Sequence, residues 1–246
     1  MQIIDFAGGT DIGRVREQNQ DSILLSSFEH SDVHVFVVAD GVGGHKGGEV
    51  ASQLAVDTIK ETIQKAVLQA SSGGGYGEHW LEKTLEHAIL EANKKILDEQ
   101  QDPDLYNMAT TVVALLIKDT QLAISYLGDS RCYAYCNNKL TQITQDHTVL
   151  HSLSHTAVDE NSVYSHLITK ALGLTDCPEV EVECISYMPG TTYLLCSDGL
   201  TNCLSDQQIN QLLDASTELA ETIDALITYA NDNGGIDNIS AVLVKL

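Results

Sequence analysis

Short apolar runs bounded by turn residues recur along the chain and predict strands. Residues 33–39 (VHVFVVA) are rich in β-branched side chains and stop at Asp40-Gly41, which indicates a buried strand that ends in a turn. Similar runs, TTVVALLI, QLAISYLG and RCYAYC, follow one another between Thr110 and Cys136, and the turn NNK after them predicts a hairpin. Further strands are expected at residues 192–196 and 238–244.

Helical periodicity separates these groups of strands. Apolar residues recur at helical spacing over residues 51–67 and 81–96, on either side of a flexible break, SSGGGYG. Two more helices are expected after residue 196, the second over residues 219–230 and capped by Gly234-Gly235. Because strands come in consecutive runs and helices in pairs, we predict an α+β fold of antiparallel sheets covered by segregated helices, in one domain spanning residues 1–246.

Composition narrows the classes of function. The 246 residues include 35 acidic and 13 basic side chains, for a formal net charge of −22. Binding to nucleic acid or to an anionic membrane surface depends on Lys and Arg, so we expect neither. No apolar run approaches the roughly 18–20 residues of a membrane helix, and the first residues do not resemble a secretory signal. The six cysteines form no C-x-x-C pair, so buried thiols in a reducing cytoplasm are expected; a zinc site at Cys132 and Cys136 is the alternative.

Four aspartates carry the first chemical signal. Asp40, Asp129 and Asp198 each follow an apolar run, in VVADG, YLGDS and LLCSDG, and Asp237 precedes the last one, in GGIDNIS. Each alone is an ordinary turn residue. If strand ends bring them together, their carboxylates repel one another unless cations join them. Mg²⁺ and Mn²⁺ prefer such oxygen ligands, and a pair of ions lowers the pKa of a water molecule enough to make it a nucleophile.

The segment TDIGRVREQNQD near the N-terminus adds a candidate anion site. Arg14 and Arg16 stand among carboxylates and amides in a chain with little arginine. A guanidinium can bind two phosphate oxygens at once, so one of these arginines is a candidate phosphate ligand. A surface ion pair is the alternative reading.

Taken together, seven segments resemble the type 2C metal-dependent Ser/Thr phosphatases (the PPM family) in their compact bacterial form. They occur in the family's order: TDIGRVREQNQD, VVADGVGGHKGGEVAS, MATTVVALLI, YLGDSRCYAY, TQDHT, LLCSDGL and GGIDNISAVLV. The resemblance implies a four-layer α-β-β-α sandwich of two antiparallel sheets flanked by helix pairs.

The resemblance also implies a ligand set for two core ions, Mn²⁺ or Mg²⁺, with a third ion as a further possibility. Asp40 would bridge the two core ions and the carbonyl of Gly41 would bind one of them. Asp198 and Asp237 would complete the shell of the first ion. Asp129 would hold the third ion together with Asp198.

Catalytic roles follow from the same resemblance. Arg16 would bind the phosphate, and Asp21 would orient the attacking water. Val42 stands where animal members carry a histidine, which leaves His45 as a candidate general acid, with a metal-bound water as the alternative. Gln20 stands where some members have a metal-binding glutamate, so water is expected to replace that ligand.

Residues 146–171 correspond to a flap beside the active site. This segment contains His147, His151, His155 and His166, whose spacing matches no closed metal site, so we expect surface residues. The implied function is hydrolysis of phosphoserine and phosphothreonine in proteins by a cytoplasmic monomer, opposed by a Ser/Thr kinase. The competing hypotheses are a non-catalytic domain of the same fold and a phosphohydrolase acting on nucleotides or phosphodiesters.

Overall fold

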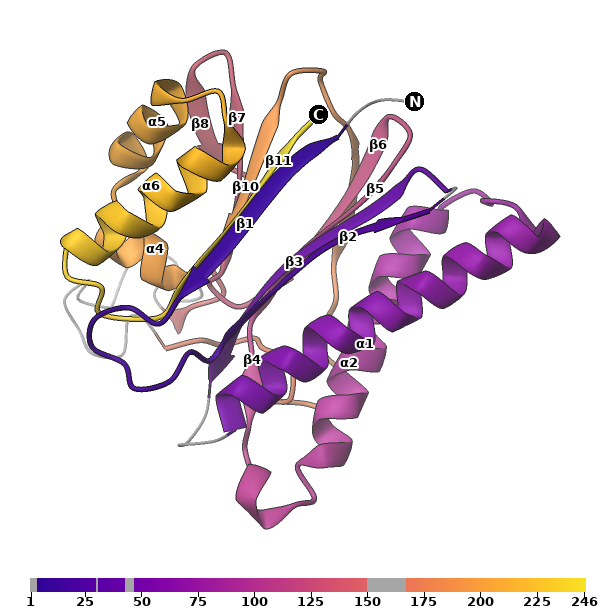
Figure 1. Cartoon of the computed structure of the whole chain (residues 1–246). Helices are drawn as coiled ribbons and strands as arrows, with labels where there is room; N and C mark the ends of the chain where they lie inside the picture. The colour runs from indigo at the N-terminus through magenta and orange to yellow at the C-terminus, as the bar shows by residue number, and fades with distance from the viewer. Residues whose placement is uncertain (1–3, 30, 43–46, 150–166) are drawn as a thin grey trace.

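The computed structural model describes residues 4–29, 31–42, 47–149 and 167–246, and its strands form two stacked antiparallel sheets (Figure 1). The first sheet has the spatial order β1 (Asp5–Asp11), β11 (Ile239–Lys245), β10 (Thr192–Cys196), β7 (Arg131–Cys136) and β8 (Lys139–Gln142). The second has the order β2 (Asp21–Phe28), β3 (Val33–Val42), β5 (Val112–Lys118), β6 (Gln121–Leu127) and β9 (Val182–Ser186), with the short β4 (Ala109–Thr110) paired to the end of β3.

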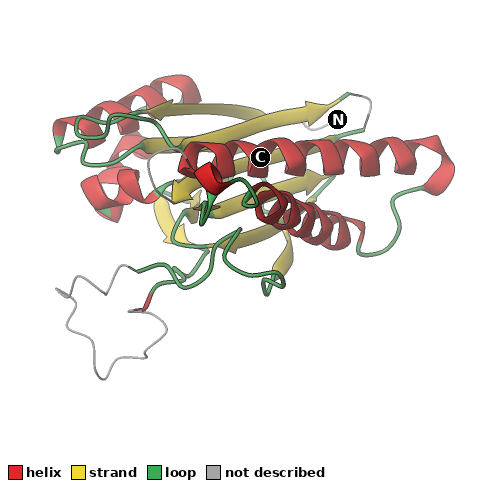
Figure 2. Ribbon diagram, turned by 90° about the horizontal axis from the view of Figure 1, so that it is seen from below, coloured by secondary structure: helices red, strands yellow, loops and turns green. Residues whose placement is uncertain are grey.

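Helices cover the outer face of each sheet (Figures 1 and 2). The second sheet is covered by α1 (Gly47–Gln69) and α2 (Trp80–Glu99), joined by the π-helical turn η1 (Ala70–Gly74) and followed by the 3₁₀ turn η2 (Pro103–Leu105). The first is covered by α4 (Asp198–Cys203), α5 (Asp206–Ala215) and α6 (Leu219–Asp232). The predicted four-layer sandwich is thus confirmed.

In the described part of the chain, three apolar clusters hold the layers together. Successive side chains of a strand point to opposite faces of its sheet, which decides the cluster to which each residue belongs. In β3, Val35 and Val37 face α1 and α2, whereas Phe36 and Val38 face the other sheet. Leu194 and Leu243 of the first sheet pack under α5 and α6. Both faces of the central strands are buried, which explains why these strands are continuous apolar runs rather than alternating ones.

The structure departs from the predicted elements in three places. Strand β3 does not end before Asp40, because Gly41 and Val42 pair with β4. Three helices, not two, follow β10, since the short α4 starts at Asp198. Strand β9 was not predicted; it is an edge strand with largely exposed side chains, so its sequence carries little apolar pattern.

Among the described residues, no helix is both long enough and apolar enough to cross a lipid bilayer.

Candidate metal centre and active site

The predicted aspartates come together at one end of the two sheets. Asp21, the first residue of β2, is paired directly with Asp40 of β3. Asp129 lies in the turn between β6 and β7, Asp198 begins α4 after β10, and Asp237 lies two residues before β11. Antiparallel pairing therefore brings strand ends that are far apart in sequence to the same edge.

The mutual repulsion of these carboxylates is seen in their pKa values. Burial raises the pKa of Asp40 well above its usual range, and the charges of Asp21, Asp198, Asp237 and Asp129 raise it further. Desolvation and like charge act in the same direction here, so Asp40 favours a bound proton or a bound cation.

Three of the other carboxylates have pKa values that are raised for the same two reasons, burial and neighbouring negative charge. Burial, then the charge of Asp198, raises the pKa of Asp129 to about 7. Burial raises the pKa of Asp21 to about 6, although hydrogen bonds from serine hydroxyls act against the shift. Burial and the charge of Asp237 raise the pKa of Asp198. Neighbouring acidic side chains that shift one another's pKa values are typical of functional sites.

The donor set fits hard divalent cations. One buried oxygen each of Asp21 and Asp198 (Oδ1 in both) has no hydrogen-bond partner. A buried carboxylate oxygen without a partner is costly, and a cation removes that cost. Within the described ranges, no three His, Cys, Asp or Glu side chains already converge on one point. As an all-oxygen set, these neighbouring carboxylates suit Mn²⁺ or Mg²⁺.

Gly41, the predicted carbonyl ligand, is held where only glycine fits. Its amide donates to the carbonyl of Gln20 at 3.1 Å. A Cβ atom on Gly41 would lie 2.1 Å from the carbonyl oxygen of Gly48 at the start of α1. Gly41 therefore lets the end of β3 pack against the start of α1 beside Asp40. The candidate general acid, His45, lies outside the described residues.

Arg16 points to the same cluster. Its Nη2 donates to Oδ2 of Asp237 at 2.7 Å, and its side chain is 52% exposed. The hydrogen bond to Asp237 raises the pKa of Arg16, although partial burial lowers it. The ion pair considered from sequence is therefore present, but the guanidinium keeps free donors on an open face beside the carboxylates.

Buried hydroxyl groups that were not predicted fix the backbone of Asp40. Thr111 accepts the Asp40 amide hydrogen at 3.0 Å and shares a 2.7 Å hydrogen bond with Ser130, the residue after Asp129. Thr110 donates to the Asp40 carbonyl at 2.9 Å. These hydroxyls link the Asp40 strand to the Asp129 turn. Polar residues within the apolar run MATTVVALLI are the signal that could have identified them.

A further buried hydroxyl, that of Ser197, holds Asp21. Ser197 donates to Oδ2 of Asp21 at 2.8 Å and accepts the Ser240 amide hydrogen at 3.0 Å. Ser240 in turn bonds Thr10 at 2.8 Å. Because Oδ2 is satisfied in this way, Oδ1 is the oxygen of Asp21 left for the site.

The base of the expected flap is fixed beside Asp129. The backbone amide of His147 donates to the Gly128 carbonyl at 2.9 Å, and its ring nitrogen Nδ1 accepts the Gly128 amide hydrogen at 3.2 Å. The same ring stacks on Tyr126 with centroids 5.1 Å apart. His147 is therefore partly buried and held by its neighbours, whereas His151, His155 and His166 lie outside the described residues.

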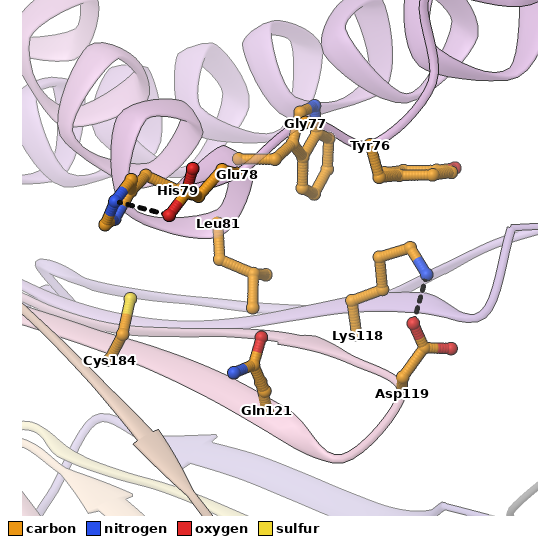
Figure 3. A pocket seen from close by; sticks show the side chains of 10 residues that line it. Tyr76, Gly77, Glu78, His79, Leu81, Lys118, Asp119, Gln121 and Cys184 are labelled. Atoms are coloured by element: carbon orange, nitrogen blue, oxygen red, sulfur yellow. Dashed lines mark hydrogen bonds and ion pairs between the residues drawn. The ribbon is translucent and has the colours of Figure 1, made fainter.

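A cavity of about 430 Å³ lies elsewhere, between the start of α2 and the β5–β6 turn (Figure 3). Lys118 forms an ion pair with Asp119 there and lies over the ring of Tyr76. Lys118 is paired with Val33, seven residues along β3 from Asp40, which places it roughly 20 Å from the carboxylates at ~3.3 Å per residue. The cavity is thus separate from the metal centre.

The fold thus combines two stacked antiparallel sheets with a cluster of carboxylates and an arginine at one edge. Residues 9–243 match the family model described as protein phosphatase 2C. The Serine/threonine phosphatase stp of Listeria monocytogenes serotype 4b is 38% identical to the chain, over 96% of this chain and 93% of that protein.

Solved structures agree with this match. Serine/threonine phosphatase Stp1 from Staphylococcus aureus superposes with a TM-score of 0.88 and 27% identity, covering 100% of this chain and 96% of that one. The catalytic domain of PstP in complex with two manganese ions gives a TM-score of 0.81 and 32% identity, covering 98% and 97%. The chain belongs to the protein phosphatase 2C family. It is a metal-dependent protein serine/threonine phosphatase, and phosphorylated proteins are its substrates.

Proposed function

We propose that the five clustered aspartates and Arg16 form the catalytic centre of this phosphatase. Asp40 would bridge two divalent cations, with the Gly41 carbonyl, Asp198 and Asp237 as further ligands. Asp129 would hold a third ion with Asp198. The observation that supports this proposal most directly is the shared electrostatic field, since four of the five carboxylates have raised pKa values through burial and one another's charge.

The bound cations would supply charge neutralisation and a lowered pKa for the nucleophilic water. The chain's own groups orient the reaction. Arg16, half exposed beside Asp237, would bind the phosphoryl oxygens through its free N–H groups. Asp21, with Oδ2 fixed by Ser197 and Oδ1 unpartnered, would accept a hydrogen bond from the attacking water.

The reaction is then a direct displacement. The water oxygen forms a bond to phosphorus while the bond to the seryl or threonyl oxygen breaks, and a proton passes to the departing oxygen. His45 is the candidate donor of that proton. No covalent phosphoenzyme is required, so no cysteine takes part.

The substitution Asp40→Asn tests this assignment. We expect kcat/KM for p-nitrophenyl phosphate with Mn²⁺ to fall by at least about 100-fold, because a bridging charge contributes several kcal/mol to stabilising the transition state. Asp57→Asn, an exposed position on α1, is the matched control and should keep wild-type activity. Full activity in Asp40→Asn would disprove the assignment.

A panel of esters separates the competing hypotheses. The proposal expects hydrolysis of the aryl phosphate and of phosphoserine and phosphothreonine peptides, sensitive to EDTA, and little hydrolysis of phosphodiesters. Binding of phosphopeptides without turnover would favour a non-catalytic domain instead.

The wider context is also proposed. The chain would act as a single-domain cytoplasmic monomer that reverses a Ser/Thr kinase in bacterial signalling. The formal charge of −22 supports the expectation of no nucleic-acid or membrane partner.

A further inference from the structure

Two exposed apolar side chains stand next to the proposed phosphate site. Val15 precedes Arg16 in the loop between β1 and β2, and Ile236 precedes Asp237 in the loop between α6 and β11. Val15 is 65% exposed and Ile236 is 53% exposed. Figure 1 shows these two loops running together at one edge of the sandwich.

The two loops are linked through the residues that flank Val15 and Ile236 in sequence. The Arg14 amide donates to the Gly235 carbonyl at 2.7 Å, and Arg16 is paired with Asp237 at 2.7 Å. Val15 stands between Arg14 and Arg16, and Ile236 stands between Gly235 and Asp237, so the two apolar residues lie on loops that are bonded to each other at the neighbouring positions. We call Val15 and Ile236 the rim pair.

The backbone under the rim pair is fixed. Gly13 has φ = +81°, and a Cβ atom there would lie 2.2 Å from the carbonyl oxygen of Asp237. This close approach, possible only for glycine, holds the two loops against each other. The rim pair is therefore presented in a defined place relative to Arg16, although its side chains are open to solvent.

A single exposed valine or isoleucine is ordinary on a protein surface. Here two of them stand on neighbouring loops that the Arg14–Gly235 hydrogen bond and the close approach of Gly13 to Asp237 join, directly beside the proposed phosphate ligand. A substrate whose phosphate is bound by Arg16 would have its flanking residues near the loop that carries Val15. The surface is therefore continuous with the active site.

We infer that the rim pair binds an apolar residue of the substrate that flanks the phosphorylated serine or threonine. This inference rests on the proposed function of the site. Contact with an apolar flanking residue removes apolar surface of both partners from water. An acidic flanking residue would gain nothing from the rim pair and would be repelled by a chain of net charge −22.

Phosphothreonine peptides test the inference. Four peptides differ only beside the phosphothreonine: serine on both sides, leucine on the N-terminal side, leucine on the C-terminal side, and aspartate on both sides. We expect kcat/KM for one leucine peptide to exceed that of the serine peptide by about fivefold, the scale for partial burial of one such side chain. The aspartate peptide should be the poorest substrate.

The double substitution Val15→Thr and Ile236→Thr removes the apolar surface and keeps β-branched side chains at both positions. We expect the preference for leucine to disappear through a higher KM for that peptide. The ratio of kcat/KM for the leucine peptide to that for p-nitrophenyl phosphate should fall with it. Met188→Thr is the matched control, since Met188 is 60% exposed in the β9–β10 loop, and it should leave the ratio unchanged.

The outcomes are distinct. Equal kcat/KM for the leucine and serine peptides in the wild type would overturn the inference, as would a leucine preference that persists in the double variant. Both results are compatible with hydrolysis of p-nitrophenyl phosphate, so they would leave the proposed function intact. Loss of all hydrolysis in Asp40→Asn tests that function separately.

Discussion

Asn238 is predicted to position the arginine loop, and its replacement should affect catalysis more than stability. The side chain is 4% exposed, and its amide forms three hydrogen bonds with that loop. Its Nδ2 donates to the carbonyls of Ile12 at 3.0 Å and Gln18 at 2.9 Å, and its Oδ1 accepts the Gln20 amide hydrogen at 2.8 Å. One side chain thus holds both ends of the segment that carries Arg16.

The size of the effect follows from these bonds. In Asn238→Ala, water can reach the carbonyls of the exposed residues Ile12 and Gln18, so the free energy of unfolding should fall by only about 1–3 kcal/mol. Arg16 would lose its fixed position relative to the carboxylates. A displacement of about 1 Å at a catalytic group can cost on the order of 100-fold, so we expect kcat/KM for p-nitrophenyl phosphate to fall by about 10- to 100-fold.

Asn93 provides a matched control for this prediction. It is 1% exposed, and its amide accepts from the Gly173 amide at 2.8 Å and donates to the Thr175 carbonyl at 2.9 Å. Asn93→Ala should lose similar stability in urea unfolding yet retain kcat/KM within about threefold. If Asn238→Ala and Asn93→Ala behave alike in both assays, Asn238 is a structural residue and the argument for positioning is wrong.

Two further predictions concern the carboxylates. Without divalent cations, the folded protein holds protons on Asp21 (pKa about 6) and Asp129 (pKa about 7) that the unfolded chain releases near 3.8, so Tm measured in EDTA should fall as pH rises from about 4 to 7. Mn²⁺ should remove this trend, and a rising Tm in EDTA would contradict it. Thr111→Val keeps the shape but removes the partner of the Asp40 amide and of Ser130, so stability should fall by about 1–3 kcal/mol. Calorimetric Mn²⁺ titration should show weaker binding, and an unchanged titration would count against the positioning role of Thr111.

The layers of the fold could be predicted from sequence because burial leaves a local pattern. Strand β3 is apolar on both faces, and α6 carries apolar residues at helical spacing, so both are evident in short windows of sequence. Strand β9 has exposed side chains at Glu183 and Cys184, and nothing in its own residues distinguishes it from a loop. It becomes a strand because β6 offers an unpaired edge, which is a property of the sheet.

The carboxylates of the candidate site could be predicted from sequence, but the hydroxyl groups that hold them could not. Aspartate after an apolar run is a local signal, and it was sufficient to select Asp40 and Asp198. The groups that hold these carboxylates act over long separations in sequence, as with Ser197 and Asp21, which are 176 residues apart. Such partners depend on strand register, which residue types alone do not specify.

The net charge of the site governs both the ion pair of Arg16 with Asp237 and the proposed binding of phosphate by Arg16. The site gathers five carboxylates near Arg16 and is strongly negative, so its field alone would repel a phosphate ester. Cations among the carboxylates would reverse that field and weaken the hold of Asp237 on the arginine. Because Arg16 uses Nη2 for Asp237 and is half exposed, its remaining donors can reach an ester without a change in the loop. The pairing observed with Asp237 keeps the guanidinium beside the carboxylates, as the proposed phosphate-binding role of Arg16 requires.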